Sequence, residues 1–83
     1  MLNGPGARLG VGVAGLGQLA REVHLPLLAR LPGVQVVAIA DPSAEARQHG
    51  RTLAPAARVC ETLDELLNET AVQAVVVATP TAD

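Results

Sequence analysis

Residues 11–20, VGVAGLGQLA, decide the fold of this chain, because a short apolar run there meets a glycine-rich turn. The run Leu9–Ala14 predicts a strand buried on both faces, and a helical pattern follows the glycines directly. Gly15, Gly17 and Ala20 form the pattern G-x-G-x-x-A between these elements. There the first glycine permits a tight turn, the second lets a pyrophosphate approach the backbone, and the alanine allows close helix–sheet packing. The stretch therefore indicates dinucleotide binding; the alternative is a plain strand-to-helix turn.

An acidic residue at the end of the next apolar run strengthens this interpretation. Asp41 follows Val34–Ala40, a β-branched run that predicts a second strand. A carboxylate at that position can accept hydrogen bonds from both hydroxyls of an adenosine ribose, and it repels the extra phosphate of NADP. No arginine follows Asp41 until Arg47, which favours NAD over NADP, yet Ser43 and Arg47 still leave a route for binding a phosphate. A second role for Asp41, compatible with the first, is to cap a helix that begins at Pro42.

The other ligand contacts are expected at the start of the first helix and after the last strand. The unpaired N–H groups of Leu16–Leu19, together with the positive end of the helix dipole, are suited to hold a pyrophosphate. Thr79 and Pro80 follow the apolar run Val72–Ala78, at the carboxyl edge where ligands bind open α/β sheets. For Thr79 and Pro80 the alternative is an ordinary turn.

The remaining chain alternates predicted helices with predicted strands. Apolar residues recur at helical spacing between Leu16 and Leu31, and Pro26 within this pattern predicts a break near His24 and Leu25. A second helix is expected from about Ser43, weakening at Gly50. The further expected elements are a short strand at 58–60, a helix at 63–68 that begins with a Thr62–Glu65 capping box, and a strand at 72–78.

The resulting order, β-α-β-α-β-α-β, predicts the α/β class with a parallel sheet. If the glycine turn has the meaning given above, the fold is a partial Rossmann fold with strand order 3-2-1-4. Residues 1–8, rich in glycine and proline, are expected to be a flexible N-terminal tail. Residues 9–83 are expected to be the N-terminal part of a dinucleotide-binding domain.

Composition argues against several other classes of function. The 83 residues include no aromatic side chain and carry a net charge of −2, so neither a stacking platform nor a basic surface for nucleic acid is present. No apolar run approaches the roughly 20 residues that span a bilayer, and the start lacks the layout of a secretory signal, which favours a cytoplasmic protein without a membrane partner. The single cysteine, Cys60, and the separated His24 and His49 predict no metal site. Cys60 is expected to be a core residue and His24 a structural residue at the helix break.

Three segments carry a resemblance to a known family. The residues GVAGLGQLAREVHLPLLARLPGVQVVAIADPS at 12–43, TLDELL at 62–67 and VQAVVVATPT at 72–81 resemble the N-terminal domain of the Gfo/Idh/MocA oxidoreductases. This is the family of glucose–fructose oxidoreductase and inositol dehydrogenase. The resemblance covers Leu9 to Thr81, and its more distinctive parts are His24-Leu25-Pro26, Asp41-Pro42 and Ala78-Thr79-Pro80.

The resemblance implies an NAD- or NADP-binding Rossmann domain and a second α+β domain that binds a sugar, a cyclitol or a related alcohol or carbonyl compound. It implies pyrophosphate binding at Gly15, Leu16, Gly17, Gln18 and Leu19, a ribose contact at Asp41, and nicotinamide-side contacts at Ala78, Thr79 and Pro80. It assigns no catalytic residue, because the family's Glu-Lys-Pro segment would follow the last residue of this chain, which contains no lysine. We therefore expect a cofactor-binding portion without a substrate domain and without turnover of its own.

Two further hypotheses remain open at this point. The chain is alternatively a non-catalytic nucleotide-binding or interaction module that forms a homo-oligomer through the exposed edge of strand 72–78. It is alternatively another Rossmann-type binder, such as a flavoprotein or a methyltransferase, since an acidic residue after the second strand suits any ligand that contains a ribose.

Overall fold

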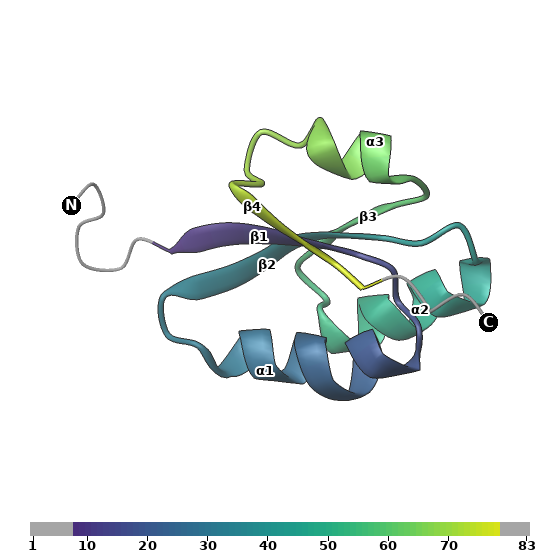
Figure 1. The fold of residues 1–83 in the computed structure, drawn as a ribbon, viewed down its shortest axis with the longest axis horizontal. Coiled ribbons are helices and arrows are strands. Elements are labelled where there is room, and N and C mark those ends of the chain that lie inside the picture. Colours follow the sequence, from purple (N-terminus) through teal and green to yellow (C-terminus); the bar gives the residue numbers. More distant parts are fainter. Residues whose placement is uncertain (1–7, 79–83) are drawn as a thin grey trace.

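The computed structural model describes residues 8–78, in which one parallel sheet lies between helices (Figure 1). Its strands are β1 (Leu9–Ala14), β2 (Val34–Ala40), β3 (Arg58–Cys60) and β4 (Ala74–Val77). The order across the sheet is β3-β2-β1-β4, and each neighbouring pair runs parallel. The α/β class, the partial Rossmann fold and the strand order 3-2-1-4 are therefore confirmed.

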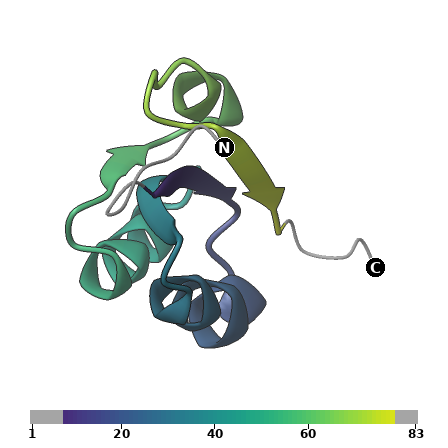
Figure 2. The ribbon, with the colours of Figure 1, turned by 90° about the vertical axis from the view of Figure 1, so that its left-hand side faces the viewer.

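The helical segments are η1 (Ala20–His24), α1 (Leu25–Arg30), α2 (Ala44–Leu53) and α3 (Leu63–Leu67). Figures 1 and 2 show α1 and α2 on one face of the sheet and α3 on the other. This placement follows from right-handed crossovers between parallel strands, which reverse their side of the sheet where the strand order reverses. None of the helices within residues 8–78 has the length and apolar character that crossing a bilayer requires.

Each face of the sheet has its own small core, built from aliphatic side chains and Cys60. The core beneath α1 and α2 consists of Val11, Val13, Leu16, Ala20, Leu25, Ile39 and Ala57. The core beneath α3 consists of Ala38, Ala40, Cys60 and Leu66. Ala38, Ile39 and Ala40 alternate between these two cores, as the two-residue period of a strand demands. Val34 and Val36 pack against the same core as Ile39, because the register with β1 shifts by one residue between Val36 and Ala38. The sheet is thus buried on both faces near the carboxyl ends of β1 and β2, where the predicted site lies.

The predicted bounds of β1, β2 and β3 match the structure, while β4 is shorter than the predicted 72–78. The expectation that the second helix weakens at Gly50 is wrong, because α2 continues to Leu53. Gly50 is buried there, and a Cβ atom on it would lie 2.9 Å from methyl groups of both Leu16 and Ile39. The glycine brings the helix close to the sheet and does not end it.

The break expected at Pro26 is not a break in the helix. His24 and Leu25 keep right-handed helical angles, and η1 is a π-helical turn in which the Leu25 N–H donates to the Ala20 carbonyl. Proline lacks an N–H and clashes with the carbonyl of the fourth residue before it, so a normal α-helical turn is unfavourable there. The wider π turn accommodates Pro26, which lies in the first turn of α1.

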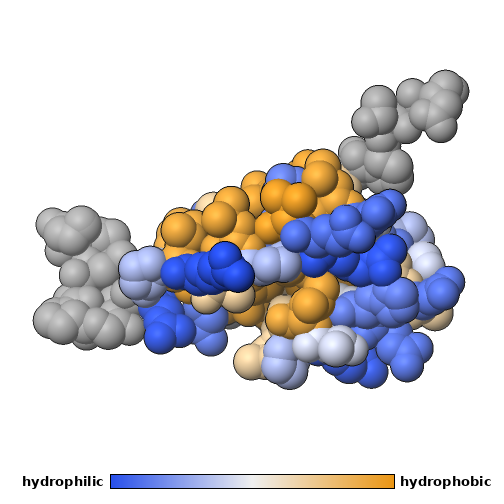
Figure 3. Space-filling model, turned by 90° about the horizontal axis from the view of Figure 1, so that it is seen from below, coloured by the Kyte–Doolittle hydropathy of each residue, from blue (hydrophilic) through white to orange (hydrophobic). Residues whose placement is uncertain are grey.

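The π turn also rotates the buried face of this helix. After Ala20 the next buried residue is Leu25, five positions on, and Leu28 packs partly against the same core. Several of the apolar residues that recur at helical spacing between Leu16 and Leu31 therefore lie outside the core. Leu19, Val23, Leu27 and Leu31 are 61%, 45%, 54% and 42% exposed. Figure 3 views the molecule from the side of α1 and α2 and shows apolar side chains in exposed patches beside hydrophilic ones.

Candidate functional site

The glycine turn between β1 and the first helix has the geometry that the sequence predicts. Gly15 has φ of 95°, a conformation that side chains disfavour, and its N–H donates to the Ala40 carbonyl at 2.8 Å. Around the Cβ position of Gly17, no heavy atom outside the adjoining chain lies within 4 Å. Gly15 is thus required by the turn itself, while Gly17 leaves the surface open next to the helix N-terminus.

Asp41 connects the end of β2 to this turn. Its Oδ2 accepts the Leu16 N–H at 2.7 Å and its Oδ1 accepts the Ser43 N–H at 2.8 Å. An ionised carboxylate has about four acceptor sites, so each oxygen retains one for another donor. The structure therefore brings the predicted ribose ligand and the predicted phosphate turn into direct contact, which spacing alone did not predict.

Two details of the predicted roles change with this contact. The Leu16 amide is bonded to Asp41, so in this structure it does not lie open for a pyrophosphate. The residue that caps α2 is Ser43, whose hydroxyl accepts the Ala46 N–H at 3.2 Å. The expectation that Asp41 caps a helix starting at Pro42 is therefore wrong, because α2 begins two residues later.

The amides that remain for an anion belong to the first helical turn. Gln18 is the first helical residue, and the first main-chain bond of the helix runs from the Arg21 N–H to the Gly17 carbonyl at 3.0 Å. The amides of Gln18, Leu19 and Ala20 precede this bond and have no acceptor within the helix. They lie directly after the open surface at Gly17, which is the arrangement that binds phosphate groups at helix N-termini.

A cleft of about 460 Å³ opens beside Asp41 at the carboxyl edge of the sheet. The ends of β1, β2 and β4 and the loop before α3 form it. Its lining residues are Ala14, Gly15, Ala40, Asp41, Pro42, Glu61, Thr62, Leu63 and Val77. The walls are mainly aliphatic, and the carboxylates of Asp41 and Glu61 are its charged groups. Such a cleft fits a flat apolar ring that is attached to a hydroxylated sugar.

The predicted nicotinamide-side residues lie partly within the described chain. The Ala78 N–H donates to the Ala14 carbonyl at 2.8 Å, which places Ala78 beside the start of the glycine turn. Thr79 and Pro80 lie outside the described residues. The position of Ala78 agrees with a ligand that extends from Asp41 across the end of β1 towards β4.

Sequence reasoning missed Glu61 and Leu63 as cleft residues and gave Thr62 only a capping role. The sequence did contain a signal for these residues. Residues 58–60 were expected to form a strand next to β2, so the residues that follow it must reach the same carboxyl edge of the sheet as Asp41. The capping box is confirmed in part: Thr62 Oγ1 accepts the Glu65 N–H at 3.1 Å. Glu65 Oε1 accepts the N–H of Glu61 at 2.7 Å, whereas in the usual capping box it accepts the N–H of the capping residue itself, here Thr62.

His24 and Cys60 do not line the cleft. His24 is half-buried at the junction of η1 and α1, as expected for a structural role. Cys60 is buried, and burial raises the pKa of its thiol, an effect that the carboxylates of Glu65 and Glu69 reinforce. A thiol that stays protonated is a weak nucleophile, in agreement with a core role. Within residues 8–78, no group of three acidic, histidine or cysteine side chains is arranged to hold a metal ion.

A parallel sheet of this order, with a glycine turn before a helix and a carboxylate after the second strand, defines a dinucleotide-binding Rossmann domain. A model of one such family, the Gfo/Idh/MocA oxidoreductase family with its NAD-binding Rossmann fold, matches residues 9–83. The chain belongs to this family.

Named relatives support this assignment. The chain is 40% identical over 73 residues to an inositol 2-dehydrogenase of Leifsonia xyli subsp. xyli, covering 87% of the chain and 21% of the relative. It is similar to the crystal structure of GenD2 from gentamicin A biosynthesis in complex with NAD, with 41% identity, a TM-score of 0.75, and coverage of 92% and 21%. It is also similar to KijD10, a 3-ketoreductase from Actinomadura kijaniata in complex with TDP-benzene and NADP. That match has 29% identity, a TM-score of 0.79, and coverage of 88% and 23%. The chain thus spans between a fifth and a quarter of the length of these proteins.

Proposed function

We propose that this chain binds NAD at the carboxyl edge of its sheet and supplies the cofactor site of an oxidoreductase. The observation that carries the proposal is the Asp41 carboxylate, which is tied to the glycine turn through Leu16 and borders the cleft. Gly17 gives the second support, because the space around its Cβ position leaves the backbone open to a pyrophosphate. The residues present therefore fit the cofactor.

Each part of the dinucleotide has its own set of residues in this proposal. The amides of Gln18 and Leu19 bind the pyrophosphate, and Gly15 and Gly17 allow its approach. The remaining acceptor sites of Asp41 receive the two hydroxyls of the adenosine ribose. Ala78 borders the nicotinamide half, together with Thr79 and Pro80. The backbone contacts of Asp41 with Leu16 and Ser43 hold its carboxylate in one orientation before the cofactor binds.

NAD is the proposed cofactor and NADP the weaker ligand. Asp41 can accept a hydrogen bond from a 2′-hydroxyl, whereas it repels a 2′-phosphate. GenD2, at 41% identity, was solved with NAD, and KijD10, at 29% identity, with NADP. The higher identity to the NAD complex agrees with the electrostatic argument.

For the whole protein we propose oxidation or reduction of a sugar, a cyclitol or a related alcohol or carbonyl compound. The nicotinamide ring, when bound, accepts or donates the hydride. The residues of this chain bind and orient the cofactor, and we assign none of them to proton transfer. The relatives named above include an inositol dehydrogenase and a ketoreductase, which supports this substrate class. The cytoplasmic location remains a prediction.

Calorimetric titration of the purified chain with NAD, NADP, FAD and S-adenosylmethionine tests the cofactor. We expect NAD to bind best, because the site offers acceptors for a ribose diol and amides for a diphosphate. A preference for FAD or S-adenosylmethionine would contradict the proposal and would favour a flavoprotein or a methyltransferase.

Replacing Asp41 by Asn tests the ribose contact. We expect a loss of about 2 kcal/mol in NAD binding, which is about thirtyfold, because a charged acceptor becomes a neutral amide. NADP binding should fall less, since the repulsion of the phosphate also disappears. Asp64→Asn is the matched control: Asp64 is exposed in the first turn of α3 and does not line the cleft. Unchanged NAD affinity in a folded Asp41→Asn variant would contradict the assigned role.

We also propose that the chain self-associates through β4. This strand lies at one edge of the described sheet, and its Val77 is 57% exposed. An exposed apolar strand edge offers unpaired main-chain groups to another strand. Sedimentation velocity at micromolar concentrations should show a species larger than the monomer, and Val77→Lys should shift it to the monomer. A wild-type chain that sediments only as a monomer would contradict this proposal.

A further inference from the structure

We propose that Glu61 determines the preference for NAD over NADP, together with Arg47, and the inference rests on the binding of NAD proposed above. Glu61 follows β3 directly and lines the same cleft as Asp41, with a side chain that is 71% exposed. The cleft therefore presents two carboxylates where the adenosine ribose is expected, one from the end of β2 and one from the end of β3.

The position of Glu61 at the cleft is fixed by its backbone. Its N–H donates to Glu65 Oε1 at 2.7 Å, and Glu65 is held in turn by the first turn of α3, where its own N–H donates to Thr62 Oγ1. The Asp41 N–H donates to the Cys60 carbonyl at 3.3 Å, which ties the residue before Glu61 to the end of β2. The two carboxylates are therefore carried by adjacent, hydrogen-bonded backbone segments.

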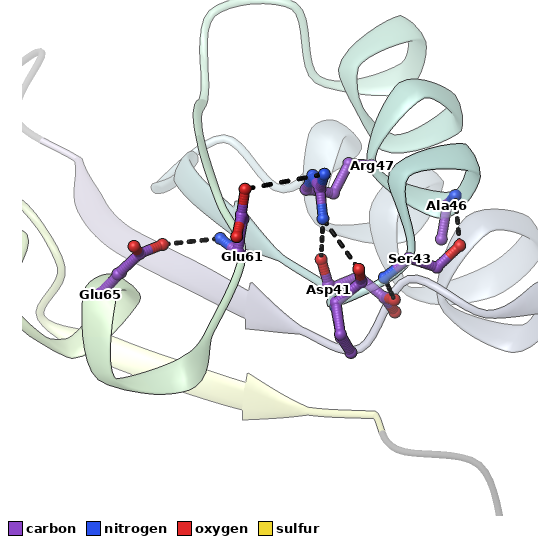
Figure 4. Close-up of polar contacts among 7 residues, drawn as sticks. Asp41, Ser43, Ala46, Arg47, Glu61 and Glu65 are labelled. Carbon is purple, nitrogen blue, oxygen red and sulfur yellow. Dashed lines mark hydrogen bonds and ion pairs between the residues drawn. The ribbon is translucent and has the colours of Figure 1, made fainter.

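Arg47 is the cation that a 2′-phosphate would need, but its guanidinium already contacts other groups. Its Nη1 donates to the carbonyls of Asp41 and Pro42, at 2.9 and 3.0 Å. Its Nη2 lies 3.9 Å from Glu61 Oε2, and the side chain is only 19% exposed. Figure 4 shows the guanidinium between Glu61 and the backbone of Asp41. Its donors thus point at the loop carbonyls and at Glu61.

Glu61 therefore acts against a 2′-phosphate in two ways. It adds a second negative charge near a group that itself carries close to two negative charges at neutral pH. It also pairs with Arg47 Nη2 while Nη1 is bonded to the loop carbonyls, which opposes rotation of the guanidinium into the cleft. A 2′-hydroxyl meets neither obstacle, because it carries no charge and needs only the acceptor sites of Asp41. The pair Glu61–Arg47 consequently discriminates between the two cofactors without a large effect on NAD itself.

Calorimetric Kd values for NAD and NADP, measured for the wild type and for variants of the full chain, test this inference. We expect Glu61→Gln to strengthen NADP binding about tenfold and to leave NAD binding within about twofold. Glu61→Asp retains the charge and should keep the wild-type ratio. Glu61→Gln combined with Arg47→Gln should lose the part of the gained NADP affinity that the released Arg47 supplies. Glu69→Gln is the matched control, because it removes one charge from a residue that pairs with Arg58 and does not line the cleft.

The outcomes separate this inference from the proposed function. A wild-type chain that binds NAD, with an NADP-to-NAD affinity ratio unchanged in Glu61→Gln, would overturn the role of Glu61 and leave the cofactor assignment intact. An equal gain in Glu69→Gln would also overturn it, because the effect would then be one of net charge. A folded wild-type chain that binds neither dinucleotide would overturn the proposed function and this inference with it.

Discussion

Replacing Gly17 by leucine should weaken NAD binding about a hundredfold, close to 3 kcal/mol, while the chain remains folded. No heavy atom outside the adjoining chain lies within 4 Å of the Cβ position of Gly17, and its φ is not in the left-handed region. The protein itself therefore has room for a side chain there. The same space is where a pyrophosphate must approach the amides of Gln18 and Leu19, so a leucine side chain excludes the ligand.

The control for this experiment is Gly33→Leu. Gly33 lies in the turn before β2, where a Cβ atom would likewise meet nothing within 4 Å. Both variants should unfold at denaturant concentrations close to that of the wild type, and only Gly17→Leu should lose NAD affinity in calorimetry. Equal NAD affinity in the two variants would mean that the glycine turn does not approach the ligand. The cofactor site would then have to be sought elsewhere on the chain.

The elements that the sequence predicts well are those in which local pattern and tertiary packing agree. β1 is buried on both faces beyond Leu9, and so are the last three residues of β2, so the carboxyl ends of both strands follow from hydropathy. Asp41 was identified for the same reason, because it is the first polar residue after such a run. The glycine turn needs positive φ at Gly15, and the pattern of small residues reveals this directly.

The features that the sequence does not predict arise from contacts between distant segments. In the sequence Gly50 indicates the end of a helix, whereas in the structure it lies within α2 and packs against Leu16 and Ile39. Pro26 looks like a break because the π turn that absorbs it has no strong signature in sequence. The bond between Asp41 and the Leu16 amide joins residues 25 positions apart, and the cleft position of Glu61 depends on the pairing of β3 with β2. Such contacts follow from the strand order and are not visible in any single segment.

Replacing Gly10 by alanine should have the largest effect on folding. Gly10 is buried at the start of β1, and a Cβ atom there would overlap the carbonyl oxygen of Ala71 and come within 3.2 Å of its carbonyl carbon. These are backbone atoms, so a rotamer change cannot relieve the clash. The neighbouring chain is also fixed, because Gly10 and Gln73 exchange two hydrogen bonds of 2.8 Å. One bond runs from the Gly10 N–H to the Gln73 side chain and the other from the Gln73 N–H to the Gly10 carbonyl.

Relief of the clash in Gly10→Ala therefore requires β1 and the segment before β4 to move apart, which breaks both bonds to Gln73. We expect the free energy of unfolding to fall by about 3 kcal/mol, at the upper end of overpacking effects. Urea denaturation followed by circular dichroism measures this, with Gly33→Ala as the control, where we expect a change of less than about 1 kcal/mol. A Gly10→Ala variant as stable as the wild type would show that the approach of Ala71 to β1 is not maintained in solution. Because Ala78 reaches the cofactor site through β4, NAD binding should weaken in proportion to the unfolded fraction and recover at lower temperature or with added osmolyte.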